Sequence, residues 1–196
     1  MTAPLLSVVV YGEPQTAGNK TAYPRQGRDG RLHVAMVDGR RPEARARGRD
    51  WRHDVVMAVC AQMSGREPFD FPLEASLTFT VRRPGNLPAR RRAGGVLVPV
   101  RHYPGQRPDL VKMTRAVEDA VTAGGGWRDD ARVVLYRRLG KFYAGDALYG
   151  EPDVLATPGI VLRVWAADCR LSAAPGTVMD MGDPEGVTRD MRGAAQ

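Results

Sequence analysis

The sequence predicts a single domain of the α+β class, in which two main helices pack on one mixed β-sheet. A chain of 196 residues can bury one core of ordinary size. Its hydrophobic content of 43% and charged content of 26% are typical of globular proteins. Segments with strand patterns precede, separate and follow two segments with helical periodicity, so both kinds of element are expected to share one core.

Five segments carry the patterns of β-strands. The first is short and rich in β-branched residues, and the third alternates between apolar and polar side chains, which is typical of a half-buried strand. The expected strands are residues 5–11, 32–37, 73–82, 132–143 and 159–166. Residues 12–31, between the first two strands, are rich in glycine, proline and basic side chains and are expected to form a loop.

Two segments show the periodicity of amphipathic helices. In residues 49–63, Trp51, Val55 and Val59 recur at helical spacing, so Trp51 is expected in the core. The second helix follows Asp109, which stands where an N-cap belongs, and it stops at three consecutive glycines. At about 100° per residue, one face carries Leu110, Met113, Val117, Ala120 and Val121, and the other Lys112, Arg115, Glu118, Asp119 and Thr122.

The chain carries a formal charge of +7 at pH 7, and its charges are segregated along the sequence. Basic residues gather in residues 40–52, 82–92 and 137–141, whereas acidic residues concentrate in residues 118–130. This arrangement suits an enzyme that binds a polyphosphate backbone and recruits a cation to it. The alternative is that the arginines reflect a GC-rich genome, which does not explain the segregation of the acids.

Residues 84–106 form an insertion rich in proline, glycine and arginine, which ends shortly before Asp109. Loops of this length are usually functional or disordered, so two alternatives are open: a basic flap over DNA, or plain disorder. Residues 1–171 are expected to form the domain. Residues 172–196 lack periodicity and are expected to form a disordered tail.

The sequence contains no feature typical of membrane insertion or secretion. No apolar run reaches the length of a membrane-spanning helix, and the first ten residues lack the features of a signal peptide. We therefore expect a cytoplasmic protein without a membrane partner. Cys60 and Cys169 lie far apart and are expected to be buried apolar residues, not a disulfide or a metal pair.

Carboxylates stand at both ends of the second helix: Asp109 before it, and Asp129 and Asp130 just past its end. A short returning segment would bring them together. Each also has an ordinary explanation, with Asp109 as a helix cap, the aspartate pair as turn residues, and Glu118 as a surface charge paired with Arg115. No single residue is diagnostic, and the functional interpretation depends on their order and spacing.

That order resembles the RusA family of Holliday-junction resolvases, small endonucleases of phage and prophage origin. The matching segments are Arg107-Pro108-Asp109-Leu110, Arg115-Ala116-Val117, Asp119-Ala120, Trp127-Arg128-Asp129-Asp130 and Val133. The resemblance implies that Asp109 and Asp130 are catalytic, magnesium-binding carboxylates, and that Arg115 replaces a functionally important lysine. The family's second aspartate, two residues after the first, is Val111 here.

A site for Mg²⁺ needs only one or two carboxylates, together with water and substrate phosphate. Asp109 and Asp130 meet that minimum, with Asp129 or Glu118 as auxiliary ligands and Mn²⁺ as a substitute ion. Glu118 lies two turns from Val111 on the same helix face, so we consider it a candidate to compensate for the lost aspartate. Arg115 is expected to orient a phosphate or to stabilise the charge that develops on it.

The resemblance also implies a homodimer that makes symmetric cuts in branched double-stranded DNA, encoded by a phage or prophage and active in the bacterial cytoplasm. The residues expected to contact DNA are Lys20, Arg25, Arg90, Arg91, Arg92, Arg107 and Lys112. Two alternatives stay open. One is a basic DNA-binding relative that has lost metal affinity at Val111, and the other is a nuclease with a different structural preference.

Overall fold

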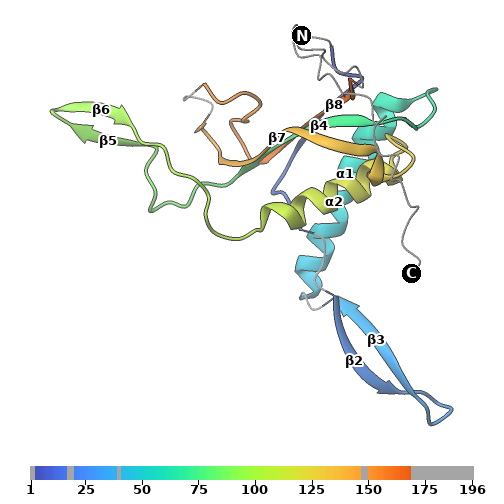
Figure 1. The fold of residues 1–196 in the computed structure, drawn as a ribbon. Helices are drawn as coiled ribbons and strands as arrows, with labels where there is room; N and C mark the ends of the chain where they lie inside the picture. The colour runs from blue at the N-terminus through green and yellow to red at the C-terminus, as the bar shows by residue number, and fades with distance from the viewer. Residues whose placement is uncertain (1–2, 17–19, 39–40, 147–149, 169–196) are drawn as a thin grey trace, which may run out of the picture.

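A computed structural model of the chain describes residues 3–16, 20–38, 41–146 and 150–168. The predicted tail at 172–196 and Cys169 lie outside these residues. Figure 1 shows a twisted sheet with two helices against one of its faces, and two hairpins that project from this body. Among the described residues, no helix is both long enough and apolar enough to cross a membrane.

The central sheet contains four strands in the order β1-β8-β4-β7. These strands are β1 (Leu6–Tyr11), β4 (Leu73–Val81), β7 (Val133–Tyr143) and β8 (Gly159–Ala166). β8 pairs antiparallel with both β1 and β4, whereas β4 and β7 run parallel. The sheet is therefore mixed, and with two helices on it the fold is of the predicted α+β class.

Helices α1 (Pro42–Met63) and α2 (Leu110–Ala123) bury their apolar faces against this sheet. As expected, Trp51 lies in the core, with 4% of its surface exposed. α1 starts at Pro42 and not at residue 49 as predicted, because proline is well suited to the first turn of a helix. The residues buried in α1 begin only at Trp51, so apolar periodicity could not reveal the earlier turns.

Strand β4 is buried on both faces, which differs from the half-buried strand predicted by its alternation. Its polar residues Ser76, Thr78 and Thr80 are 6%, 0% and 0% exposed. They lie on the face away from the helices, which the connector between β7 and β8 covers: the amide of Leu155 donates to Thr80 Oγ1 at 3.0 Å. The polar face of this strand is therefore packed against protein and not against water.

Two hairpins extend from the body. The sequence predicted one of their strands, at residues 32–37, but it placed the other three hairpin strands in loops. β2 (Lys20–Gln26) pairs with β3 (Leu32–Asp38), so the expected loop at 12–31 contains a strand. β5 (Arg90–Ala93) pairs with β6 (Val96–Pro99) inside the proline-rich insertion. Gly94 and Gly95 have φ values of +57° and +80°, which are the left-handed conformations that a two-residue hairpin turn requires.

Cys60 was also predicted wrongly, because its side chain is exposed and not buried. Its thiol contacts the carbonyl oxygen of Gly124, directly after α2, at 3.5 Å.

Candidate active site

Two irregularities in β7 decide which of its side chains face the helices. In the pairing of β4 with β7, Val134 and Arg137 have no partner, so each is an extra residue in β7. Alternate residues of β4 share one face of the sheet. On the face toward the helices, the register pairs are Leu73 with Val133, Ala75 with Tyr136, Leu77 with Leu139, and Phe79 with Lys141. Without the bulge at Arg137, Tyr136 and Lys141 would lie on opposite faces. Bulges of this kind often re-aim side chains beside active sites.

A pocket of about 370 Å³ opens where α2, the 3-10 helix η1 (Asp130–Arg132) and β7 meet. Its lining residues are Val111, Thr114, Arg115 and Glu118 from α2, Asp130 from η1, and Tyr136 and Leu139 from β7. Three of the predicted site residues, Arg115, Glu118 and Asp130, therefore lie around one space. The buried face of α2 holds the helix on the sheet, and its exposed shoulder forms one wall of this pocket.

The segment that carries Asp130 is fixed by close packing immediately after α2. A Cβ atom on Gly126 would lie 2.5 Å from Val121 Cγ1, so only glycine allows the chain to turn back this tightly. Trp127 is 1% exposed, and its indole nitrogen donates to Thr122 Oγ1 at 2.8 Å. The amide of Arg128 donates to the carbonyl of Phe69 at 3.0 Å, which ties the segment to the chain before β4.

The two aspartates that follow have different surroundings. Asp129 is the N-cap of η1, where its Oδ1 accepts from the amide of Ala131 at 2.8 Å, as capping carboxylates do. Asp130 is exposed and lines the pocket. The structure therefore gives Asp129 a structural contact and leaves Asp130 facing the open space.

Asp70, which sequence reasoning missed, holds the outer side of this turn. Its carboxylate pairs with Arg128 at 2.7 Å and with Arg132 at 2.6 Å. The hydrogen bond from Arg128 lowers the pKa of Asp70 below its ordinary value, and the charge of Arg132 acts in the same direction. Both arginines near the aspartate pair therefore form their ion pairs with Asp70.

Glu118 accepts a hydrogen bond from the hydroxyl of Tyr136 and is not paired with Arg115 as the surface interpretation required. Burial raises the pKa of Tyr136 well above its ordinary value, and the bond to Glu118 and the charges of Glu118 and Asp130 act in the same direction. Tyr136 therefore stays protonated and donates, which orients the Glu118 carboxylate in the pocket. Sequence reasoning missed Tyr136, because its contact with α2 depends on the bulge in β7.

Asp109 occupies the N-cap position of α2, but its side chain forms no capping hydrogen bond. Its Oδ2 lies 3.2 Å from Lys112 Nζ instead. Lys141 of β7 holds the preceding loop, donating to the carbonyls of Gln106 at 2.6 Å and Pro108 at 2.8 Å. Burial lowers the pKa of Lys141, and the charge of Asp109 opposes this effect. Asp109 thus stands beside the pocket but does not line it.

The arrangement of carboxylates bears on the ion that this site would hold. Among the described residues, no group of three or more His, Cys, Asp and Glu side chains is placed to hold a metal ion. The four expected ligands are thus not gathered at one point. Glu118 and Asp130 do share the pocket, and two carboxylates are sufficient for Mg²⁺, which completes its shell with water and phosphate. Val111, at the family's second aspartate, also lines the pocket and is 75% exposed.

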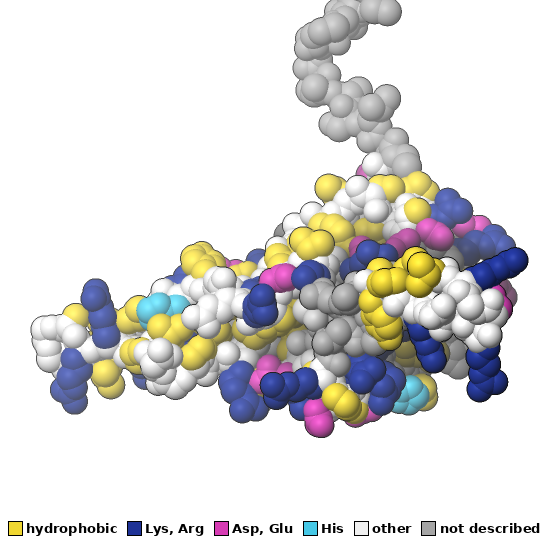
Figure 2. Space-filling view, turned by 90° about the horizontal axis from the view of Figure 1, so that it is seen from below, with side chains coloured by type: hydrophobic (Ala, Val, Ile, Leu, Met, Phe, Trp, Pro, Cys, Tyr) yellow, Lys and Arg dark blue, Asp and Glu magenta, His cyan; other side chains and the backbone are white. Residues whose placement is uncertain are grey.

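The residues expected to contact DNA are spread over the surface. Arg25 lies exposed on β2, and Arg90, Arg91 and Arg92 lie exposed on β5. Arg107 and Lys112 lie close to Asp109 and are exposed, whereas the side chain of Lys20 is outside the described residues. Figure 2 shows Lys and Arg side chains both on the projecting β5–β6 hairpin and along the body.

A family model described as Endodeoxyribonuclease RusA matches residues 24–148, which is more than half of the chain. The matched stretch contains every residue that lines the pocket. No curated protein matches the chain.

The contact between Tyr136 and Glu118 predicts a loss of stability in Tyr136→Phe. We expect the free energy of unfolding to fall by roughly 1–3 kcal/mol at neutral pH, because the carboxylate loses a partly buried donor. The pKa of Tyr136 is higher in the folded protein than in the unfolded chain, where it is about 10. The protonated tyrosine therefore makes its full contribution to stability below about pH 10, and this contribution falls as the pH rises further. The difference between parent and variant should therefore shrink above that pH.

Urea unfolding followed by circular dichroism measures this difference. Tyr11→Phe is the matched control, because Tyr11 is 65% exposed, and we expect a change within about 0.5 kcal/mol. Equal effects of the two substitutions would show that the Tyr136 hydroxyl has no special role.

Proposed function

The chain belongs to the endodeoxyribonuclease RusA family, as its motif predicted, and we propose that it is a magnesium-dependent endonuclease that cuts four-way (Holliday) or other branched DNA junctions in recombination and repair. The observation that carries this proposal is the pocket in which Arg115, Glu118 and Asp130 meet. A phosphodiester in this pocket would have two carboxylates and a guanidinium beside it.

Hydrolysis of a phosphodiester requires an activated water and stabilisation of charge on phosphate oxygens. In our proposal Glu118 and Asp130 hold Mg²⁺, or Mn²⁺ in its place, and the ion supplies Lewis-acid polarisation and a more acidic water. Tyr136 keeps the Glu118 carboxylate directed into the pocket through its hydroxyl. Arg115 binds the phosphate, because a guanidinium can donate to two of its oxygens at once.

Asp109 and Asp129 belong to the proposed site through the family motif. Asp109 contacts Lys112 in this structure, and it would exchange that contact for the ion when DNA and metal are bound. Asp129 caps η1. We therefore propose that its main role is to support the position of Asp130, and that its role as an auxiliary ligand is secondary.

The proposed substrate is branched double-stranded DNA bound by a homodimer, with the two protomers cutting two strands symmetrically. The formal charge of +7 supports attraction to a phosphate backbone. In this proposal Lys20, Arg25, Arg90, Arg91, Arg92, Arg107 and Lys112 contact phosphates. The phage or prophage origin and the action in a bacterial cytoplasm are part of the same proposal.

A second candidate function is that of a DNA-binding relative without nuclease activity. Two observations favour it: Val111 stands in place of the family's second aspartate, and no three candidate ligands are gathered among the described residues. The two candidates differ in whether metal-dependent cleavage occurs, which the following substitutions test.

We predict that Asp109→Asn and Asp130→Asn each lower the single-turnover rate of junction cleavage by at least about 100-fold, since several kcal/mol of charge stabilisation would be lost. Binding to the junction should persist or tighten, because a negative charge that faces phosphate is removed. Asp119→Asn is the control: Asp119 is exposed on the same helix but does not line the pocket. If Asp109→Asn and Asp130→Asn cut as fast as this control, the proposed site is wrong.

A further prediction concerns the position where the chain departs from its family. Val111 and Glu118 line the same pocket, so a carboxylate at either place would face the same space. We expect Glu118→Gln to lower cleavage nearly as much as Asp109→Asn, and Val111→Asp in that background to restore part of the activity. Cleavage rates measured over a range of Mg²⁺ concentrations check this. An unimpaired Glu118→Gln protein would show that Glu118 is not a ligand.

A further inference from the structure

The β5–β6 hairpin and its two connecting segments, residues 84–106, form an arm that projects from the body (Figure 1). Its strands pair only with each other, and an isolated two-stranded hairpin is at best marginally stable. Arg90, Arg91 and Arg92 are exposed on β5. Within the described part of the chain, no acidic side chain pairs with these three arginines. The arm thus presents unneutralised positive charge at a distance from the pocket.

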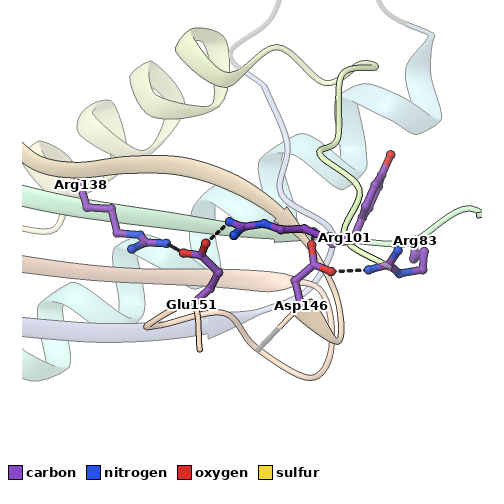
Figure 3. Close-up of polar contacts among 6 residues, drawn as sticks. Arg83, Arg101, Arg138, Asp146 and Glu151 are labelled. Carbon is purple, nitrogen blue, oxygen red and sulfur yellow. Dashed lines mark hydrogen bonds and ion pairs between the residues drawn. The ribbon is translucent and has the colours of Figure 1, made fainter. Parts of the chain in front are cut away.

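The base of the arm is held by carboxylates from the connector between β7 and β8, as Figure 3 shows. Arg83, just before the arm, pairs with Asp146, which is 1% exposed and also accepts from the amide of Tyr143 at 3.1 Å. On the returning side, Arg101 pairs with Glu151. Glu151 also pairs with Arg138 of β7 and so links the arm to the central sheet. We call Asp146 and Glu151 with these three arginines the latch.

The arginines of the arm region are thus of two kinds. Those at the base, Arg83 and Arg101, are neutralised and fix the direction of the arm. Those on β5 are exposed and free to bind a polyanion. Successive side chains of a strand point to opposite faces, so Arg90 and Arg92 share one face of the hairpin and Arg91 lies on the other. A guanidinium can donate to two phosphate oxygens at once, which suits these arginines to a phosphate backbone. The returning segment leads directly into Asp109, and Lys141 holds it at Gln106 and Pro108.

We propose that Asp146 and Glu151 position the arm so that Arg90, Arg91 and Arg92 bind the phosphates of a second duplex of a branched DNA, away from the scissile phosphate. This inference rests on the proposed function, because it assigns the arm a part of the same substrate. A linear duplex bound at the pocket has no second duplex to offer to the arm. In a branched DNA, a second duplex leaves the branch point in another direction and can reach the arm. The latch therefore makes the arm a determinant of the preference for branched over linear DNA.

The test is DNA binding without metal, measured by fluorescence anisotropy on a labelled four-way junction and on a linear duplex. The triple variant Arg90→Ala, Arg91→Ala, Arg92→Ala should bind the junction more weakly. The slope of log affinity against log salt should fall by about 1.8 to 2.7, at about 0.9 for each of the two or three phosphate contacts that are lost. Affinity for the linear duplex should change far less.

Glu151→Gln tests the latch by removing a negative charge, whereas the triple variant removes positive charges. The substitution removes a negative charge, so net charge alone predicts tighter binding to any DNA. The latch predicts instead that junction affinity falls about 10-fold, because a loosely held arm meets the second duplex at a lower effective concentration. Glu67→Gln is the matched control, since Glu67 is exposed between α1 and β4 and its loss removes the same charge. In the triple variant, Glu151→Gln should cause no further loss.

The results that would contradict the inference differ according to which part of it is wrong. If Glu151→Gln binds the junction as tightly as Glu67→Gln, or if it weakens junction and linear duplex equally, the latch does not position the arm. If the triple variant keeps the parent's salt slope, or loses self-association in light scattering instead of junction affinity, the arm does not bind a second duplex. If the parent itself binds neither DNA, the proposed function fails, and the inference fails with it.

Discussion

Packing of α2 against the helix-covered face of the sheet is the constraint on which the rest of the site depends. Met113, Val117 and Val121 are each 0% exposed, and full burial of such a side chain contributes about 1.5–3 kcal/mol. The same helix carries Arg115 and Glu118 on the shoulder that remains open. Because the buried side of the helix cannot shift without opening the core, apolar packing sets the position of these two pocket side chains.

The other two walls of the pocket are fitted to α2 by local departures from regular structure. The glycine turn lets the chain reverse directly after the helix, and Trp127 then fills the space beneath it, so that Asp130 emerges beside Glu118. The extra residue at Arg137 in β7 brings Tyr136 to the same side. Polar side chains are thus added to a hydrophobic framework at two places where the backbone departs from regular structure.

The sequence allowed prediction of the fold class and of the limits of α2, because helical periodicity, a proline and three glycines act locally. It did not allow prediction of the hydrogen bond between Tyr136 and Glu118, since this bond depends on a bulge that no alternation in residues 132–143 reveals. The contacts of Glu151 with Arg101 and Arg138 likewise join segments whose proximity only the folded sheet establishes. Local patterns in the sequence therefore do not predict polar contacts between segments that are distant along the chain.

In the proposed function, the positive charge on the hairpins holds a phosphate backbone, and the negative charge around α2 recruits a cation to it. The most direct measurement of this account is single-turnover cleavage by the unaltered protein of a labelled four-way junction, beside a linear duplex of the same sequence, with Mg²⁺ and with EDTA. The account predicts paired cuts in the junction that require Mg²⁺ and little cleavage of the linear duplex. No cleavage of the junction, or equal cleavage of both substrates, would contradict it.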